Sequence, residues 1–259
     1  MIAALLEAAY RLLRPNPHLC LHCGREERRP GAGGLIAPLR SPAARAALSE
    51  LCAACRARIP WIMTVACPVC GRSERCGDCL RRTARHFEAS RAAVRYDDGM
   101  KEWLAAYKYQ GAERLAPLLA AMLAAALERY SQAPAQSFDL IAAVPLSESR
   151  LASRGFNQAE GMATILAGWY GIPYANLLVR TRDTEKQSRK GRGARIRDMQ
   201  GLFQPAMPAI HPSFQHSSNP RILLVDDIYT TGSTMNECAR AIRQAFPTAQ
   251  IFGLAWARA

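Results

Sequence analysis

Four Cys-x-x-Cys pairs constrain this chain more than any other feature of its sequence. Eight of its nine cysteines fall between residues 20 and 79, and all eight belong to such pairs. A Cys-x-x-Cys turn directs two thiolates at one point, and two turns complete a closed tetrahedral Zn²⁺ site. The pattern therefore predicts two zinc sites. Their ligands are Cys20, Cys23, Cys52, Cys55, Cys67, Cys70, Cys76 and Cys79.

The pairs can combine in two ways. Sequential pairing joins residues 20–23 with 52–55 and residues 67–70 with 76–79, whereas a cross-braced arrangement interleaves the four pairs. We favour sequential pairing because only five residues separate Cys70 from Cys76. Four thiolates leave no open position on the metal, so both sites are expected to be structural. His18 and His22 are expected on the surface.

The N-terminus bears on whether the cysteines form disulfides instead. Residues 1–13 have no basic start and no small-residue cleavage site, so they do not resemble a signal peptide. Their apolar positions predict a short amphipathic helix. No stretch reaches the roughly 18 uncharged apolar residues of a membrane helix. We therefore expect a cytoplasmic protein without a membrane span, a setting in which disulfides are rare.

Beyond Cys79 the pattern changes to apolar runs that alternate with helical segments, which predicts an α/β fold with a mainly parallel sheet and flanking helices. We divide the chain into an N-terminal helix and double zinc module, residues 1–86, and an α/β domain, residues 87–259. Strands are expected at residues 91–96, 140–144, 176–181, 222–226 and 250–255. Helices are expected at residues 100–109, 115–130, 157–170 and 234–246.

The sharpest motif is RILLVDDIYTTGST, residues 221–234. An apolar strand ends in Asp226 and Asp227, and a loop of small hydroxyl residues around Gly232 then opens a helix. A helix start offers free backbone N–H groups to a phosphate, and glycine permits close approach. Two adjacent carboxylates repel phosphate, so they are expected to face hydrogen-bond donors such as ribose hydroxyls. A sugar phosphate satisfies both halves of the motif.

This motif resembles the phosphoribosyl diphosphate (PRPP) signature of type I phosphoribosyltransferases. The wider order of motifs is similar to the ComF family, which includes competence protein ComF and GntX, over nearly the full chain. A cysteine-rich module comes first, and the later motifs are KYQG at 108–111, VPL at 144–146, RGFNQ at 154–158, RTRDT at 180–184 with Gln187, and the PRPP signature. The resemblance implies a type I phosphoribosyltransferase-like sheet with a hood at about residues 87–136.

The resemblance also implies roles for single residues. Asp226 and Asp227 would hold the ribose 2- and 3-hydroxyls. The 5-phosphate would lie against the loop and helix start, formed by Thr230, Thr231, Gly232, Ser233 and Thr234. Thr230 stands where purine-specific members carry an acidic catalytic residue, so purine chemistry is not expected. Mg²⁺ would accompany PRPP.

Two basic segments are expected near the diphosphate. The loop at residues 145–155 leaves a strand end opposite the signature and carries Arg150 and Arg154, and Lys108 could reach the site from the hood. Residues 180–197 hold eight basic and two acidic residues and resemble the mobile loop that closes over diphosphate. The members of that loop are Lys186, Gln187, Arg192 and Arg195. A solvated loop and a strip that binds nucleic-acid phosphates are alternative interpretations.

Two hypotheses about function remain open. The net charge of +13 favours an anionic partner, and the family resemblance implies a role in DNA uptake, natural transformation or nucleotide-related metabolism. The first hypothesis is a phosphoribosyltransferase that transfers phosphoribosyl from PRPP to an unidentified nitrogen acceptor. The second is a non-catalytic PRPP sensor or vestigial domain that binds single-stranded DNA, with other competence proteins as further partners.

Overall fold

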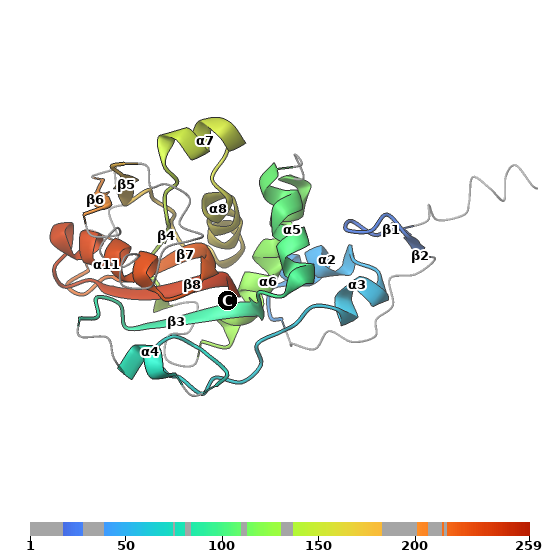
Figure 1. Cartoon of the computed structure of the whole chain (residues 1–259), viewed down its shortest axis with the longest axis horizontal. Helices are drawn as coiled ribbons and strands as arrows, with labels where there is room; N and C mark the ends of the chain where they lie inside the picture. Colours follow the sequence, from blue (N-terminus) through green and yellow to red (C-terminus); the bar gives the residue numbers. More distant parts are fainter. Residues whose placement is uncertain are drawn as a thin grey trace, which may run out of the picture.

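A parallel β-sheet forms the centre of the molecule (Figure 1). The computed structural model describes residues 18–27, 39–74, 76–80, 84–109, 113–130, 137–182, 201–206, 214 and 217–259. The sheet has the order β3-β8-β7-β4, and every pair of neighbours is parallel. Its strands are β3 (Ala89–Arg95), β4 (Leu140–Ala143), β7 (Arg221–Tyr229) and β8 (Gln250–Arg258). The predicted mainly parallel α/β fold is confirmed.

Helices cover both faces of this sheet. Helices α6 and α8 pack against each other and against the strands on one face, while α11 packs on the other. The four long helices are α5 (Asp98–Tyr109), α6 (Ala116–Glu128), α8 (Gln158–Tyr170) and α11 (Ser233–Ala245), and a 3₁₀ turn, η1 (Glu113–Leu115), precedes α6. Their bounds lie within two residues of the predicted helices.

Burial on both faces explains the continuous apolar runs in the central strands. In β7, Leu223 and Val225 belong to the core beneath α6 and α8, whereas Ile222 and Leu224 belong to the core beneath α11. Side chains alternate between the two faces of a strand, so a strand covered on both sides has no polar positions. The run ILLV is therefore apolar throughout.

Two local predictions need correction. The segment predicted as a strand at residues 176–181 forms β5 (Leu178–Arg180), which pairs antiparallel with β6 (Phe203–Pro205) in a separate small sheet. The segment predicted as a loop at residues 145–155 contains the helix α7 (Glu148–Arg154). Ser147 precedes it in extended conformation, and Gly155 ends it in the left-handed region, where glycine is favoured.

The cysteine-rich segment folds as short elements that pack on the sheet domain. A hairpin of β1 (His18–Leu19) and β2 (Glu26–Glu27) flanks the first cysteine pair, and α2 (Pro42–Ser49) packs against α6. Helix α3 (Ala53–Ala57) begins after Cys52, and α4 (Gly77–Leu80) follows Cys76. The division at residues 86 and 87 stays a prediction, because the core residues of the two parts are contiguous.

The two groups of cysteines belong to cores on opposite faces of the sheet. Cys20, Cys52 and Cys55 lie in the core with α6 and α8, and Cys67, Cys70 and Cys76 lie in the core with α11. In Figure 1, α2 and α3 accordingly lie far from α4. The chain between the two groups must therefore pass the edge of the sheet.

That crossing segment, residues 59–69, runs along the edge strand β3. Arg95 N donates to Pro60 O at 2.9 Å, Ile62 N to Ala93 O at 3.0 Å, and Ser90 N to Val69 O at 2.6 Å. These bonds satisfy edge groups of β3 that have no neighbouring strand. We call residues 59–69 the edge linker.

Several expectations fall on other parts of the chain. The predicted N-terminal helix at residues 1–13 lies outside the described residues, as does most of the predicted mobile loop, including Lys186, Gln187, Arg192 and Arg195. Among the helices that the structure describes, none is long and apolar enough to cross a membrane.

Candidate functional site

The acidic pair of the PRPP-like signature lies where strand β7 loses one of its two neighbouring strands. Strand β7 pairs with β4 only as far as Val225, whereas its pairing with β8 continues to Tyr229. Asp226 and Asp227 therefore follow the last β4 pairing and lie within β7, which continues to Tyr229. The sequence predicted that the strand ends at these two carboxyl groups. Ligands of open α/β sheets bind at such carboxyl-terminal ends of strands.

A pocket of about 270 Å³ opens beside the two carboxyl groups. The residues that line it come from the end of α5, the turn after β4, helix α7, the start of α8, and β7 with the first turn of α11. Of the residues predicted for the site, the pocket brings together Lys108, Arg150, Arg154, Asp226, Asp227 and Thr234. Arg180, from β5, also lines it.

The two carboxyl groups differ in their surroundings. Asp226 is 9% exposed, and burial, together with the adjacent charge of Asp227, raises its pKa well above the ordinary value. Burial acts on Asp227 in the same direction, but the nearby Lys108 ammonium outweighs it and lowers the pKa of Asp227. Lys108 forms an ion pair with Asp227. The pair thus combines one readily protonated and one ionised carboxyl group.

Helix α7 contributes the two arginines, and Arg154 is held in place by its neighbours. Its Nη1 donates to Gln158 Oε1 at 2.8 Å and its Nη2 to Tyr109 Oη at 2.9 Å. Arg154 also lies over the Tyr109 ring, 5.1 Å from the centroid. The guanidinium therefore bridges α5 and α8 at the mouth of the pocket.

The loop between β7 and α11 leads into a helix whose N-terminus has no capping side chain. Gly232 is the N-cap residue of α11, has φ +76°, and makes no side-chain cap. Thr231 Oγ1 and Ser233 Oγ lie 2.9 Å apart, and Thr230 is exposed. A Cβ on residue 232 would contact the Tyr229 hydroxyl. Ser233 N donates to Thr231 Oγ1 at 3.4 Å. A helix start of this kind can offer N–H groups to an anion.

Two site residues were missed as functional candidates although they lie in the RGFNQ motif. Asn157 Nδ2 donates to Val144 O at 3.0 Å, and its Oδ1 accepts from Ala159 N at 3.1 Å. It ties the end of β4 to the start of α8. Gln158 is buried and accepts from Arg154. An amide directly before a predicted helix is the signal that could have identified Asn157.

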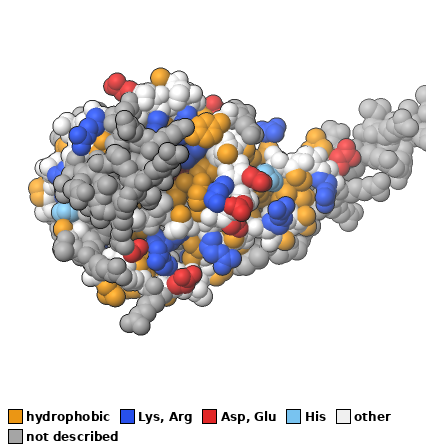
Figure 2. All heavy atoms as spheres, viewed as in Figure 1, with side chains coloured by type: hydrophobic (Ala, Val, Ile, Leu, Met, Phe, Trp, Pro, Cys, Tyr) orange, Lys and Arg blue, Asp and Glu red, His pale blue; other side chains and the backbone are white. Residues whose placement is uncertain are grey.

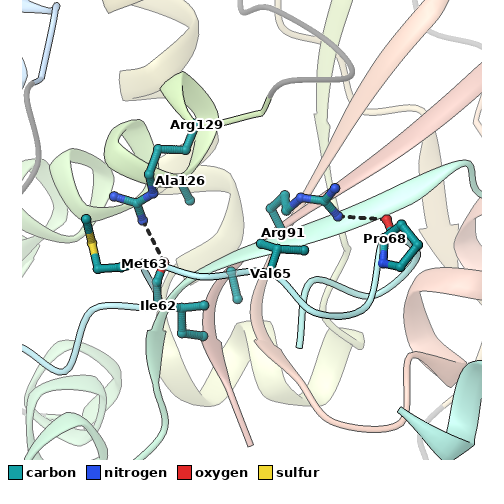
Figure 3. A pocket seen from close by; sticks show the side chains of 8 residues that line it. Ile62, Met63, Val65, Pro68, Arg91, Ala126 and Arg129 are labelled. Carbon is teal, nitrogen blue, oxygen red and sulfur yellow. Dashed lines mark hydrogen bonds between the residues drawn. The ribbon is translucent and has the colours of Figure 1, made fainter. Parts of the chain in front are cut away.

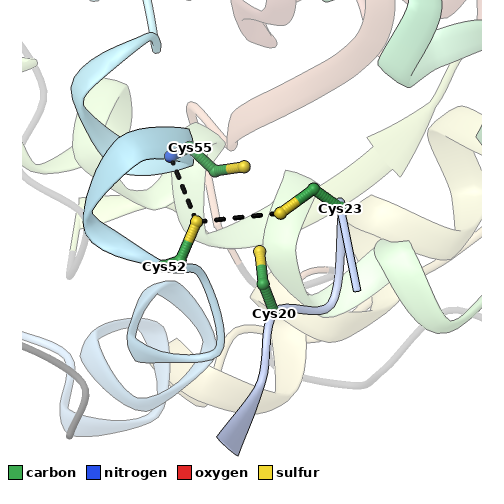
Figure 4. Close-up of side chains that lie close together, drawn as sticks. All are labelled: Cys20, Cys23, Cys52 and Cys55. Atoms are coloured by element: carbon green, nitrogen blue, oxygen red, sulfur yellow. Dashed lines mark hydrogen bonds between the residues drawn. The ribbon is translucent and has the colours of Figure 1, made fainter. Parts of the chain in front are cut away.

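The eight paired cysteines form two groups, and the groups confirm sequential pairing. In each, the four Sγ atoms lie within 4.8 Å of one another; Figure 4 shows the first group converging from the β1–β2 turn and α3. Cys23 Sγ lies 3.8 Å from Cys52 Sγ, and Cys70 Sγ 3.5 Å from Cys76 Sγ. Bonds of 2.3 Å in a tetrahedron place sulfurs about 3.8 Å apart, so each group fits one Zn²⁺.

The surroundings of the thiols favour a bound cation. Burial opposes ionisation of Cys20, yet backbone hydrogen bonds lower the pKa of its thiol to about 6; the same balance lowers the pKa of Cys76 to about 7. Burial and the neighbouring sulfurs raise the pKa of Cys55 and Cys79. Four thiolates this close require a cation to offset their repulsion.

His22 and Cys238 lie outside the two sulfur groups. His22, expected on the surface, is half-buried and stacks on Trp103, with ring centroids 4.2 Å apart; it is not in either sulfur group. Cys238 lies fully buried in α11, as expected for a small apolar residue.

The sequence of the chain is similar to those of known competence proteins. No family model matches the chain. It is 31% identical over 201 residues to the competence protein ComFC of Streptococcus pneumoniae, covering 76% of this chain and 83% of the relative. It is 28% identical over 211 residues to the Bacillus subtilis competence protein ComFC, covering 78% and 81%.

Among solved structures, the chain aligns with an adenine phosphoribosyltransferase from Leishmania tarentolae. The alignment covers 55% of this chain and 71% of that one, with 15% identity and a TM-score of 0.26. A score this low carries no argument about the site.

Proposed function

Because the chain belongs to the ComF family of competence proteins, we propose that it acts in DNA uptake and that its acidic pocket binds PRPP. The observation that carries the proposal is the meeting of Asp226 and Asp227 with the basic side chains of α5 and α7 around one pocket. Carboxylates suit the hydroxyls of a ribose, and the basic side chains suit the phosphates attached to it.

Different groups of the pocket would bind the ribose and the phosphates of the ligand. Asp226 and Asp227 accept hydrogen bonds from the ribose hydroxyls, and a protonated Asp226 can also donate one. The 5-phosphate accepts hydrogen bonds from the backbone N–H groups at the start of α11 and from the hydroxyls of Thr231, Ser233 and Thr234. Arg150, Arg154 and Lys108, which line the same pocket, supply cations for the diphosphate.

Magnesium would accompany the ligand. Oxygen ligands and phosphates are its usual partners in proteins, and Asp226 and Asp227 are the carboxylates that line the pocket. Bound there with the diphosphate, Mg²⁺ would neutralise charge on that group. The two zinc ions, held by the sulfur groups, would be structural.

Phosphoribosyl transfer is the reaction such a site would support. A nitrogen of the acceptor forms a bond to the anomeric carbon, the bond to diphosphate breaks with its electron pair, and the nitrogen releases its proton to the departing diphosphate or to water. Thr230 has no carboxyl group to accept that proton. Transfer therefore requires an acceptor that is already a good nucleophile, and PRPP binding without transfer is the alternative.

Binding of single-stranded DNA is the alternative role, and Figure 2 shows the charges on one face of the molecule. On that face, Lys and Arg side chains are interspersed with Asp and Glu and form no continuous basic band. If single-stranded DNA were bound through its phosphates, its affinity would fall steeply with rising salt concentration.

Calorimetric titration of the zinc-loaded protein with PRPP and Mg²⁺ tests the proposal. We expect saturable binding that chelation of Mg²⁺ weakens and that Asp226→Asn with Asp227→Asn abolishes. Asp98→Asn is the matched control, since Asp98 is an exposed carboxylate that pairs with Lys101 on α5. Unchanged affinity in the double variant would overturn the site, and diphosphate release on addition of nitrogen acceptors would distinguish transfer from binding alone.

A further inference from the structure

The ion pair between Lys108 and Asp227 connects the basic and the acidic side of the PRPP-like pocket. Lys108 lies in the last turn of α5, Asp227 lies on β7, and both line the pocket. Both side chains are mostly buried. When such a pair separates, each charge needs a new partner, because a buried charge without one is costly.

The carboxylate of Asp227 has further partners in the structure. It accepts hydrogen bonds from the side chain of Asp226 and from the backbone of Ile228. A carboxylate offers about four acceptor positions on its two oxygens, so these partners and Lys108 leave too few for two ribose hydroxyls. A ribose that binds at Asp227 therefore competes with Lys108.

Arginines that line another pocket, at the edge of the sheet, have partners of a different kind. Figure 3 shows Arg91 and Arg129 bonded to the edge linker. Their acceptors are backbone carbonyl groups, Pro68 O at 2.9 Å and Ile62 O at 3.1 Å. Lys108 differs because an anion that draws it away releases a carboxylate of the PRPP-like pocket.

The consequence for a ligand depends on which groups it carries. Ribose 5-phosphate would separate the ion pair without giving Lys108 a new anion, since its phosphate is assigned to the start of α11. Diphosphate alone would draw Lys108 away and leave Asp227 without a cation. A ligand with both groups separates the pair once and provides hydroxyls for Asp227 and phosphate oxygens for Lys108.

We propose that the Lys108–Asp227 ion pair couples the ribose and diphosphate parts of the pocket, so that each group strengthens the binding of the other. The inference rests on the proposed function, because it takes hydroxyls to bind at Asp227 and diphosphate at Lys108. Lys108 is then a specificity-determining residue. It favours PRPP over ribose phosphates that lack the diphosphate, and these include the product of phosphoribosyl transfer.

The test presents the two parts of PRPP as separate molecules. Ribose 5-phosphate is titrated by calorimetry into the full-length, zinc-loaded protein with Mg²⁺, in the presence and absence of saturating diphosphate. We expect diphosphate to raise the affinity for ribose 5-phosphate about fivefold or more. Lys108→Met should abolish this rise, and Lys108→Arg, which keeps the charge, should retain it.

Arg154→Gln is the matched control. Arg154 lines the same pocket, but the described acceptors of its hydrogen bonds, in Gln158 and Tyr109, are uncharged. The substitution should weaken diphosphate binding and still leave the rise once diphosphate is saturating. Lys108→Met alone should bind ribose 5-phosphate at least as tightly as the natural protein, because Asp227 no longer has to release a cation.

A second variant examines the pair from its other member, which keeps the test decisive if Lys108→Met fails to fold. Asp227→Asn releases Lys108 and should bind diphosphate more tightly than the natural protein does. Asp226→Asn, which leaves the ion pair in place, should not.

The proposal is overturned if diphosphate leaves unchanged or weakens the affinity of the natural protein for ribose 5-phosphate. It is also overturned if Lys108→Met keeps the rise, if Arg154→Gln loses it, or if Asp226→Asn strengthens diphosphate binding as much as Asp227→Asn. A natural protein that does not bind PRPP at all would instead refute the proposed function. The two failures are therefore distinguishable.

Discussion

The ammonium group of Lys108 on α5 forms an ion pair with the carboxylate of Asp227 on β7. The contact joins the predicted hood to the strand that carries the acidic pair. Their side chains are 13% and 22% exposed, so the pair is largely removed from water. Lys108 therefore neutralises the charge of Asp227 before any ligand arrives.

Lys108→Met should destabilise the protein at neutral pH. Asp227 would keep its burial but lose the cation that lowers its pKa. We expect a loss of about 1–3 kcal/mol in the free energy of unfolding, measured by urea denaturation. A lowered folded pKa stabilises above the ordinary pKa of an aspartate and ceases to do so as the pH falls, so the effect of the substitution should shrink in acid.

Lys101→Met provides the control for this prediction. Lys101 lies on the same helix and pairs with Asp98 at 2.7 Å, but that pair is exposed, and exposed pairs contribute little. The control should leave stability unchanged. Equal destabilisation by both substitutions would show that the helix, and not the buried ion pair, is the cause.

Asp226→Asn should stabilise the fold while it removes PRPP binding. The raised pKa of Asp226 means that folding disfavours its ionised form. The stability of the natural protein is then fully present below the ordinary aspartate pKa and declines as the pH rises towards the raised value. We expect a gain of about 0.5–2 kcal/mol at neutral pH and no gain near pH 4. A thermal melt at each pH measures both; a gain that is independent of pH would contradict the assignment.

Gly232→Ala should impair both stability and PRPP binding. Residue 232 has φ +76°, and a Cβ there would contact Tyr229. A cost of about 1–3 kcal/mol is expected from the strained backbone. Gly168→Ala is the matched change within the exposed part of α8, where a Cβ meets no atom within 4 Å; it should stabilise by up to about 1 kcal/mol. Denaturation of the two variants side by side checks the contrast.

Metal analysis should find two zinc ions in each chain. Cys67→Ser with Cys70→Ser should reduce the content to one, whereas Cys238→Ser should leave it at two. Because Cys67 and Cys70 share a core with the sheet, loss of the second ion should also lower the melting temperature of the α/β part, and not only of the cysteine-rich part. Protein purified without chelator that contains no zinc would refute both sites.

Local sequence signals accounted for much of this fold. The run ILLV and the residues TTGS placed β7 and α11 within a few residues, because a strand buried on both faces and a helix start each depend on neighbouring residues. Short separation along the chain predicted the pairing of Cys70 with Cys76. Helix α7 also has signals at both ends, Ser147 and Gly155, but it is only seven residues long and the sequence predicts a loop there.

Contacts between distant residues could not be predicted in this way. Leu178–Arg180 forms a strand outside the main sheet because its partner is Phe203–Pro205. Lys108 could be suggested for the site, but its partner Asp227 depends on how α5 packs over the sheet. The distribution of the cysteine groups over two faces depends on the path of the edge linker, which bonds such as Ser90 N to Val69 O determine.

The position of the edge linker suggests a second role for the two zinc ions. The linker covers β3, an edge strand; Cys55 of one cysteine group precedes it, and Cys67 of the other lies near its far end. Removal of zinc would release the linker and leave an apolar strand edge open to pairing with another molecule. We expect chelated protein to self-associate, with a rise in light scattering before the sheet unfolds. Zinc would then protect the protein against aggregation through a strand edge as well as stabilise its fold.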